Sequence, residues 1–582
     1  MLRRLLRIVL IPLLMAGLGY GSQALAMFAF DQFANYRGPA MGSLPAGRPT
    51  APISQRVVVV VVDGLREDTS HQMPAFQRLR QQGADLPAWT GLPSLSLPGY
   101  TTLGTGAYPG FSTVTSNWYS GPVPVDSLFA RAKDAGLPTA LVAMAGWDSL
   151  YAPWVTWSYT VTWPEGVQGI QAGAMTTEEI GQEAGRMLGE SDVALLYVHF
   201  GETDAAGEAH GGTSPEYMEA ALHVDAQIEV IAGRLDWSRD TLVLTADHGM
   251  IAWRGRGGHG GGEAVARRTP LVMVGRGIVP GTYAEGGQVD LVPTVAALLG
   301  LPIPAHSQGH TRLELLVLTP EQRAEKALAL GAQQQDLYLA YLRALGARTD
   351  VGDLKEANAA LAAGAYDQVE GKVREFLGRL DDAVSRAEAN RLWRERAVRL
   401  PYLLLPPLAG GLFLGLYRPR RALGRPLLLA LLFFALYVAL YAGVRGYTLS
   451  FSTIGNADYD TFFLARTVDA LLAMLVVAVA AGILWRRKPW EDVVWGANLG
   501  TLSIAWLFLL QVGLYLWLFG LLVTWQLPQL GWGFKFYLDL LAATGVGFAG
   551  FLFPWLALGV SRLFILGDWV RNHWGRRRYR SA

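Results

Sequence analysis

Six consecutive valines, Val57–Val62, lead without a polar interruption into Asp63. A strand with one face in water alternates apolar and polar residues, whereas an uninterrupted apolar run is typical of a strand buried on both faces. Similar short runs, separated by helical patterns such as 214–234, follow at 139–143, 193–199, 241–245 and 271–274. This alternation predicts an α/β fold in which a mainly parallel sheet has helices on both faces.

Longer apolar runs begin near residue 400 and cover 400–417, 426–444, 461–485, 493–525 and 531–566. Each run is long enough to cross a bilayer, which takes about 20 helical residues. Another apolar run, from Ile8 to about Phe30, follows arginines near the N-terminus. We expect a transmembrane domain of five helices at the C-terminal end. At the N-terminal end we expect a membrane anchor or a cleaved signal peptide, of which the anchor is slightly favoured.

These patterns divide the chain into five parts. In chain order they are the anchor or signal, a Gly/Pro-rich linker, the α/β domain, a charged helical connector and the transmembrane domain, at 1–30, 31–56, 57–315, 316–398 and 399–582. The loops at 418–425 and 486–488 and the tail at 571–580 are basic. Because basic loops stay in the cytoplasm, we expect a cytoplasmic C-terminus. The α/β domain would then be periplasmic or extracellular, at the plasma (inner) membrane.

Composition and charge narrow the expected partners. The 582 residues are 51% hydrophobic and carry a net charge of +1, so a membrane is the expected partner and nothing favours nucleic acid. The chain has no cysteine, which excludes disulfides, thiolate metal sites and cysteine nucleophiles.

Three predicted strands end in carboxylates or imidazoles. Asp63 follows the first; Asp204, Glu208 and His210 follow the strand at 193–199; Asp247 and His248 follow the one at 241–245, and His259 lies in a glycine-rich segment soon after. Each residue alone fits a helix cap, a turn or an exposed position. Because parallel strands deliver their carboxyl ends to one edge, the combination favours a site for divalent cations such as Zn²⁺ or Mn²⁺.

A segment rich in proline and glycine, residues 91–110, carries Ser94 and Ser96. The plain interpretation is a loop of turn-forming residues. The alternative is a serine nucleophile whose hydroxyl pKa is lowered by a bound metal, as the pKa of water is. No histidine base is then required.

At these residues the chain resembles the alkaline phosphatase superfamily of metal-dependent phosphoesterases and phosphotransferases. The resemblance spans about residues 57–315 and rests on DGLR, SLPGYTTLGTGAYP, TDAAG and the series ADHGM, GGHGG and TPLVMVG. Within the superfamily the chain is similar to the type I phosphodiesterases and nucleotide pyrophosphatases. It is most similar to the GPI ethanolamine phosphate transferases, which share its order of N-terminal span, exported domain, helical connector and C-terminal spans.

The resemblance implies two divalent cations and a serine nucleophile. Asp63, Ser96, Asp247 and His248 match the ligands of one metal. Asp204, His259 and the residue four positions after Asp204 match those of the other. Ser96, the serine followed by x-Pro-Gly, would attack phosphorus, and Asn117 would bind a phosphoryl oxygen.

One position departs from the family pattern. The residue four positions after Asp204 is a histidine in the family and Glu208 here, while His210 lies two residues further on. Either Glu208 ligates the metal directly or the loop shifts so that His210 does. A third alternative is a weak site and an impaired enzyme.

Charged residues also lie within or beside the predicted spans, at Arg445, Arg466, Asp469, Lys535 and Asp539. In the expected topology all five lie near the outer leaflet, where they form a candidate site for a lipid head group. The alternative is pairing along the helices and snorkelling to the interface.

These observations favour a membrane-embedded phosphodiesterase or phosphotransferase that acts on a lipid- or glycolipid-linked phosphodiester. One alternative is a hydrolase of soluble phosphodiesters or nucleotides. Another is a lipid-handling membrane protein whose metal domain has lost activity.

Overall fold

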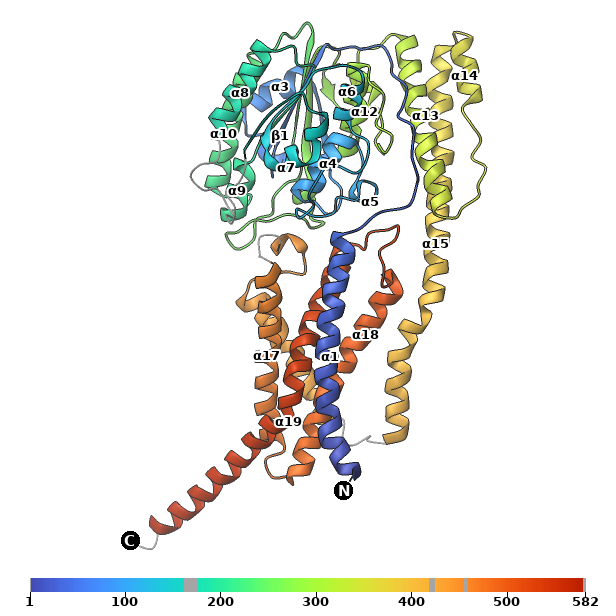
Figure 1. Cartoon of the computed structure of the whole chain (residues 1–582). Coiled ribbons are helices and arrows are strands. Elements are labelled where there is room, and N and C mark those ends of the chain that lie inside the picture. The colour runs from blue at the N-terminus through green and yellow to red at the C-terminus, as the bar shows by residue number, and fades with distance from the viewer. Residues whose placement is uncertain (1, 162–175, 418–423, 455–458, 579–582) are drawn as a thin grey trace.

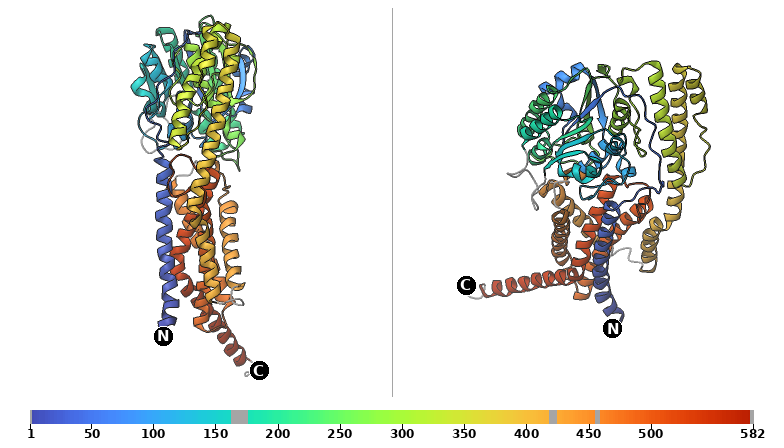
Figure 2. Two further views of the ribbon diagram at one scale, coloured as in Figure 1. Left: turned by 90° about the vertical axis from the view of Figure 1, so that its right-hand side faces the viewer. Right: turned by 45° about the horizontal axis from the view of Figure 1, so that its top comes forward.

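An α/β domain stands on one end of a bundle of long helices in the computed structural model (Figure 1). The structure describes residues 2–161, 176–417, 424–454 and 459–578. Both termini lie at the end of the bundle remote from the sheet, and the last part of α19 projects beyond the other helices (Figures 1 and 2). Most of the basic loop at 418–425 and the end of the basic tail fall outside the described residues.

Nine strands form one sheet in the α/β domain. They are β1 (Arg56–Val62), β2 (Ala84–Trp89), β3 (Thr139–Met144), β4 (Trp157–Val161), β5 (Leu195–Phe200), β6 (Asp240–Thr245), β7 (Arg268–Gly275), β8 (Gly281–Thr282) and β9 (Gly286–Gly287). The order is β4-β3-β5-β1-β6-β7-β2-β8, and β9 also pairs with β2. Strand β1 is parallel to β5 and β6, whereas β7 is antiparallel to β6 and β2. The predicted fold class, a mainly parallel sheet, is confirmed.

The valines of β1 separate into two hydrophobic cores. Val57, Val59 and Val61 belong to the core on one face, and Val58, Val60 and Val62 to the core on the other. This division follows from the two-residue period of a strand, and it explains the uninterrupted apolar run.

Helices cover both faces of the sheet. α3, α8 and α10 contribute to one core, and α4, α6, α7 and α12 to the other. The helices of this domain are α2 (Glu67–Ser70), α3 (Pro74–Gln82), α4 (Ser96–Thr105), α5 (Pro109–Ser112), α6 (Leu128–Asp134), α7 (Ala145–Tyr151), α8 (Thr177–Glu190), α9 (Glu202–His210), α10 (Pro215–Ala232), α11 (Ala264–Arg267) and α12 (Leu291–Leu299).

Three helices connect this domain to the bundle: α13 (Pro320–Ala344), α14 (Lys355–Ala362) and α15 (Tyr366–Tyr417). Lys326 of α13 is buried and donates hydrogen bonds of 2.8 Å to the Thr50 hydroxyl and to the carbonyl oxygens of Ala51 and Ala297. Helix α15 continues for 52 residues without interruption from the connector into the bundle. The connector and the first C-terminal span are therefore one helix.

Six helices in the described part of the chain are long and apolar enough to cross a membrane. They include α1 (Leu2–Ala34), α15, α17 (Tyr459–Leu484), α18 (Trp490–Phe519) and α19 (Leu530–Arg578), and the sixth extends α16 (Gly424–Val438) to Val444. α1 packs closely on α19, since a Cβ atom on Gly547 would lie 2.2 Å from the Cα of Gly19. These helices indicate a multi-pass membrane protein.

Candidate metal centre

The carboxyl ends of three adjacent strands form the site. β5, β1 and β6 are neighbours in the centre of the sheet. Asp63 follows β1, Asp204 lies in the first turn of α9 just after β5, and Asp247 and His248 follow β6. Strand order therefore brings together side chains that lie far apart in the sequence.

A first group consists of Asp63, Asp247 and His248. One ligand atom from each lies within 4.8 Å of the others. His248 Nε2 is 3.3 Å from Asp63 Oδ1 and 3.3 Å from Asp247 Oδ2. These two carboxylate oxygens are buried and have no hydrogen-bond partner among the described residues. Because His248 Nδ1 lies 3.0 Å from the carbonyl oxygen of Gly249, the proton belongs on Nδ1 and Nε2 carries a lone pair.

A second group consists of Asp204, His248 and His259. His259 Nε2 lies 3.6 Å from Asp204 Oδ1 and 3.3 Å from Glu208 Oε1, and the His248 and His259 rings stack with centroids 3.7 Å apart. Asp204 and Glu208 are four residues apart on α9, so they share a face of that helix. His210 is exposed at the end of α9 and does not share that face. The structure thus brings Glu208, and not His210, to the second group.

The convergence of electron-pair donors fits divalent cations. Unprotonated carboxylates and a neutral imidazole that face each other repel unless a cation lies between them, and oxygen and nitrogen ligands suit Zn²⁺ and Mn²⁺. Asp204 Oδ1 is a third buried carboxylate oxygen without a hydrogen-bond partner in the described residues. The residues present therefore fit a site for two cations.

Burial and charge shift the pKa values in the ways expected for such a cluster. Burial, together with repulsion from neighbouring carboxylates, raises the pKa of Asp204 and of Asp247. Burial, with His259 alongside, lowers the pKa of His248 to about 3. Burial alone would raise the pKa of Asp63, but the hydrogen bond with His199 and the adjacent imidazoles hold it below its usual range. The site carries excess negative charge that a cation would balance.

Ser96 and Asn117 lie beside these groups. Ser96 begins α4, and its Oγ is 3.3 Å from His248 Nε2. The backbone N–H of Leu97 donates to Asn117 Oδ1 at 3.0 Å. Ser96 therefore lies at the positive end of the α4 helix dipole. The N–H of Leu97, the next residue, holds the orientation of the Asn117 amide beside it.

Three residues that sequence reasoning did not assign complete the site. Ser94 Oγ accepts from the N–H of Gly260 and donates to the carbonyl oxygen of Gly261, and the Ser94 carbonyl oxygen is 3.0 Å from His259 Nδ1. Tyr100 and His199 both hydrogen-bond Asp63 Oδ2. Ser94 thus orients His259, while Tyr100 and His199 leave Asp63 Oδ1 as the oxygen that faces the cluster.

Gly64 permits the close approach of β1 to α9. Its φ is +68°, and a Cβ atom there would lie 2.8 Å from Asp204 Oδ1. A side chain at this position would be strained and would displace the carboxylate.

The loop that carries His259 rests on the bundle. The Ser452 hydroxyl accepts from the N–H of Gly261 at 2.9 Å and donates to Glu263 at 2.7 Å. A Cβ atom on Gly260 would meet the ring of Phe451. The Trp253 indole also donates to the carbonyl oxygen of Gly446 at 2.7 Å. The membrane domain therefore touches residues next to a candidate metal ligand.

A second attachment lies at the end of α1. The Thr115 hydroxyl donates to the carbonyl oxygen of Phe33 at 2.8 Å, and Tyr36 donates to that of Gly110 at 3.2 Å. With α15 and residues 442–454, the described residues provide three attachments of the α/β domain to the bundle.

The charged residues of the candidate head-group site behave differently from one another. Arg466 is fully buried among aromatic rings and pairs with Asp469, which also pairs with Arg445 at 2.9 Å. Lys535 is exposed on α19 and Asp539, four residues further on, is half-buried. We interpret Arg466 and Asp469 as a buried ion pair of the bundle, because the Arg466 side chain is fully buried and pairs with Asp469.

Comparisons with known proteins identify relatives of part of this chain. The type I phosphodiesterase / nucleotide pyrophosphatase family matches residues 57–260. GPI ethanolamine phosphate transferase 1 of Aspergillus fumigatus is 29% identical over 175 residues, which cover 25% of this chain and 17% of that protein. The human GPI ethanolamine phosphate transferase 3 catalytic subunit is 35% identical over 164 residues, covering 26% and 14%. The mouse GPI ethanolamine phosphate transferase 1 is 26% identical over 324 residues, covering 46% and 34%.

Solved structures are more distant. An inactive variant of murine ectonucleotide pyrophosphatase / phosphodiesterase 5 in complex with AMP is 15% identical, with a TM-score of 0.39, and covers 45% of this chain and 100% of its own. The alkaline phosphatase PafA is 12% identical, with the same TM-score of 0.39 and coverage of 46% and 100%. The sequence matches to the three transferases named above cover no more than 34% of the length of any of them. Residues 57–260 thus carry a type I phosphodiesterase / nucleotide pyrophosphatase domain, and the chain has homologues among the GPI ethanolamine phosphate transferases.

Proposed function

We propose that this chain is a metal-dependent phosphodiesterase or phosphotransferase that acts on a lipid- or glycolipid-linked phosphodiester outside the cytoplasm. The observation that carries the proposal is the position of Ser96 Oγ, 3.3 Å from His248 and beside two overlapping groups of cation-binding side chains. A domain of the phosphodiesterase family provides these groups.

Asp63, Asp247 and His248, with Ser96, would hold one cation, and Asp204, Glu208 and His259 the other. Zn²⁺ is the preferred occupant and Mn²⁺ the alternative, because both accept carboxylate and imidazole ligands. When bound, the cations supply Lewis-acid chemistry, which lowers the pKa of a serine hydroxyl and offsets charge on the phosphoryl oxygens.

In the reaction, Ser96 Oγ attacks phosphorus in line with the leaving oxygen. The Oγ–P bond forms as the P–O bond to the departing alcohol breaks; the serine proton passes to solvent, and the leaving oxygen takes up a proton. Water or an acceptor hydroxyl then attacks phosphorus: its O–P bond forms as the P–Oγ bond breaks, its proton passes to solvent, and Ser96 Oγ takes up a proton from solvent. Asn117 and the N-terminus of α4 would stabilise the phosphoryl oxygens throughout.

Two observations support a lipid-linked substrate. The relatives are named for transfer of ethanolamine phosphate to GPI, and the loop that carries His259 contacts the membrane domain at Ser452. We infer that the domain lies on the periplasmic or extracellular side of the plasma membrane, because the basic loops mark the opposite side as cytoplasmic. We also infer that α1 is a retained anchor, because it packs along α19.

The test uses full-length protein purified in detergent. We expect about two bound metals per chain by elemental analysis and hydrolysis of bis(p-nitrophenyl) phosphate, with activity lost in Ser96→Ala. Ser238→Ala, in an exposed loop away from the site, should match the wild type. Wild-type protein that holds no metal or has no activity would refute the proposal and favour an inactive lipid-handling protein.

Lipid analysis separates the substrate classes. A deletion strain and a Ser96→Ala strain should both lack the same phosphorylated head group. Unchanged lipids in both strains, with an active purified enzyme, would indicate soluble phosphodiesters or nucleotides as substrates.

A further inference from the structure

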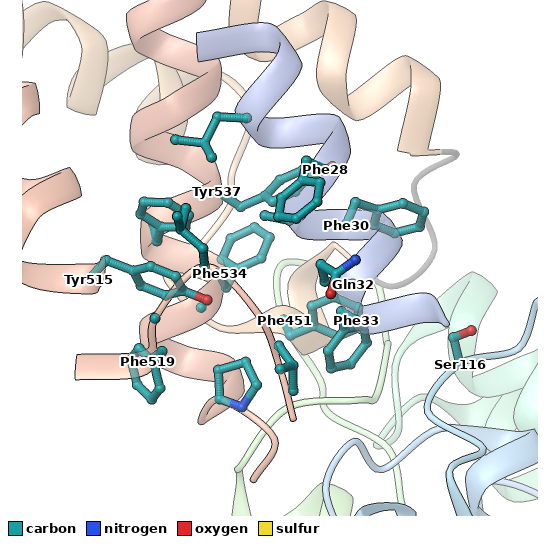
Figure 3. A pocket seen from close by; sticks show the side chains of 18 of the residues that line it. Phe28, Phe30, Gln32, Phe33, Ser116, Phe451, Tyr515, Phe519, Phe534 and Tyr537 are labelled. Atoms are coloured by element: carbon teal, nitrogen blue, oxygen red, sulfur yellow. The ribbon is translucent and has the colours of Figure 1, made fainter. Parts of the chain in front are cut away.

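An apolar pocket lies between the bundle and the α/β domain, at the ends of α1, α18 and α19 that face the sheet (Figure 3). Its empty space, which includes open solvent at the mouth, is about 1000 Å³. Among the described residues that line it none is charged, and aromatic side chains such as Phe28, Phe33, Tyr515 and Phe534 dominate. Such a lining suits a hydrocarbon chain and disfavours a head group or a sugar.

The wall of this pocket is continuous with the candidate metal centre. Leu95, which lines the pocket, directly precedes Ser96, so the two Cα atoms are about 3.8 Å apart. Ser116 and Trp118, which also line it, flank Asn117. The nucleophile and the amide beside it thus lie at one border of the pocket.

Phe451 provides a second connection. It lines the pocket, and its ring packs against Gly260, the residue after His259. Leu95 and Phe451 belong to one hydrophobic cluster with Phe534 and Phe536 of α19. Ser96 follows Leu95, a member of this cluster, and His259 precedes Gly260, which contacts it.

We propose that this pocket holds an acyl chain of the phospholipid whose phosphodiester Ser96 attacks; the proposal rests on the proposed function. The pocket lies at the sheet-facing ends of spanning helices, where a lipid of the adjacent leaflet has its phosphate at the interface and its chains below. In a glycerophospholipid only the glycerol separates phosphate from acyl chains, which matches the adjacency of Leu95 and Ser96. A glycolipid acceptor, whose reacting hydroxyl lies beyond sugars, would place its chains further away.

The test narrows the pocket without touching the metal centre. Ala29 of α1 lines the pocket, whereas Ala24 of the same helix is exposed and is not among the lining residues. The readout is the ratio of two kcat/KM values, that for phosphatidylethanolamine in mixed micelles divided by that for bis(p-nitrophenyl) phosphate. We expect Ala29→Trp to lower this ratio at least tenfold. Ala24→Trp, the matched control, should leave this ratio at the wild-type value. An unchanged ratio in Ala29→Trp would overturn the proposal.

A binding measurement tests the pocket independently of the proposed catalytic activity. Phosphatidylethanolamine with a diazirine at the end of one acyl chain is photolysed with Ser96→Ala protein, and labelled peptides are identified by mass spectrometry. We expect labels in 25–33, 515–523 and 533–537, reduced when Ala29→Trp is added. Labels confined to other lipid-facing surfaces would refute the pocket. Wild-type protein without phosphodiesterase activity would refute the proposed function but leave this labelling test valid.

Discussion

Ser452 connects the membrane domain to the second candidate metal group, and Ser452→Ala isolates that connection. The side chain is fully buried, and its hydroxyl bonds Gly261, two residues after His259, and the carboxylate of Glu263. Alanine leaves both partners without this bond. A hydrogen bond to a charged group contributes about 1.5–3 kcal/mol, and an unpaired buried N–H adds to the cost.

This loss should appear as weaker metal binding. If about 1.4 kcal/mol of this lost free energy destabilises the metal-binding position of the His259 loop, the affinity for the second cation falls about tenfold. The assay is competition for Zn²⁺ between metal-free, full-length protein in detergent and a fluorescent chelator. We expect one weakened site, while the group of Asp63, Asp247 and His248 binds as in the wild type.

Ser503→Ala is the matched control, because among the described residues the Ser503 hydroxyl bonds only the Leu499 carbonyl oxygen one turn earlier in α18, at 2.8 Å. It should leave both affinities unchanged. If Ser452→Ala bound two cations with wild-type affinity, the membrane domain would not hold the His259 loop, and the reasoning would be wrong.

Three further predictions concern single residues. Glu208→Ala should lose one of two metals by elemental analysis, whereas His210→Ala should keep both; the opposite pattern would make His210 the ligand. Gly64→Ala should destabilise the protein by about 1–2 kcal/mol, because a left-handed backbone disfavours alanine, and should lose metal as the methyl group displaces Asp204; an unchanged unfolding midpoint would contradict this. Burial lowers the pKa of Lys326 from 10.5 to about 8 in the folded protein. The unfolded chain therefore binds more protons between these values, and stability should rise from pH 8 to 10.5, by at most about 3 kcal/mol. Thermal unfolding across this range should show the rise in the wild type and its loss in Lys326→Met.

The sequence predicts the centre of the sheet and the residues at its edge. β1, β5 and β6 are short apolar runs that end in acidic or imidazole residues, and parallel neighbours bring such ends together. The fold class is confirmed for this reason. The choice between Glu208 and His210 depends on knowing that residues 202–210 form the helix α9. On a helix, Glu208 lies on the same face as Asp204, four residues earlier, whereas a loop would not distinguish Glu208 from His210.

Other features depend on contacts between distant segments. β2 contains Pro87, which argues against a strand in the middle of a sheet, yet it pairs with β7. His199 lies inside a buried strand, where nothing local distinguishes it from a packed residue, and no local pattern indicates that Ser94 orients His259, which lies 165 positions away. The bond between Ser452 and Gly261 joins residues 191 positions apart, and no local pattern encodes it.

The three attachments seen in the described part of the chain, through α1, α15 and residues 442–454, have a mechanical consequence. Hinge motion about one linker is prevented when a domain is held at three points, so the height of Ser96 above the spanning helices is set by the protein. The depth of a lipid phosphate is set instead by the thickness of the bilayer, to which spanning helices adapt by tilting. In bilayers of graded acyl length, turnover of a lipid substrate should therefore pass through an optimum, whereas turnover of a water-soluble phosphodiester should not.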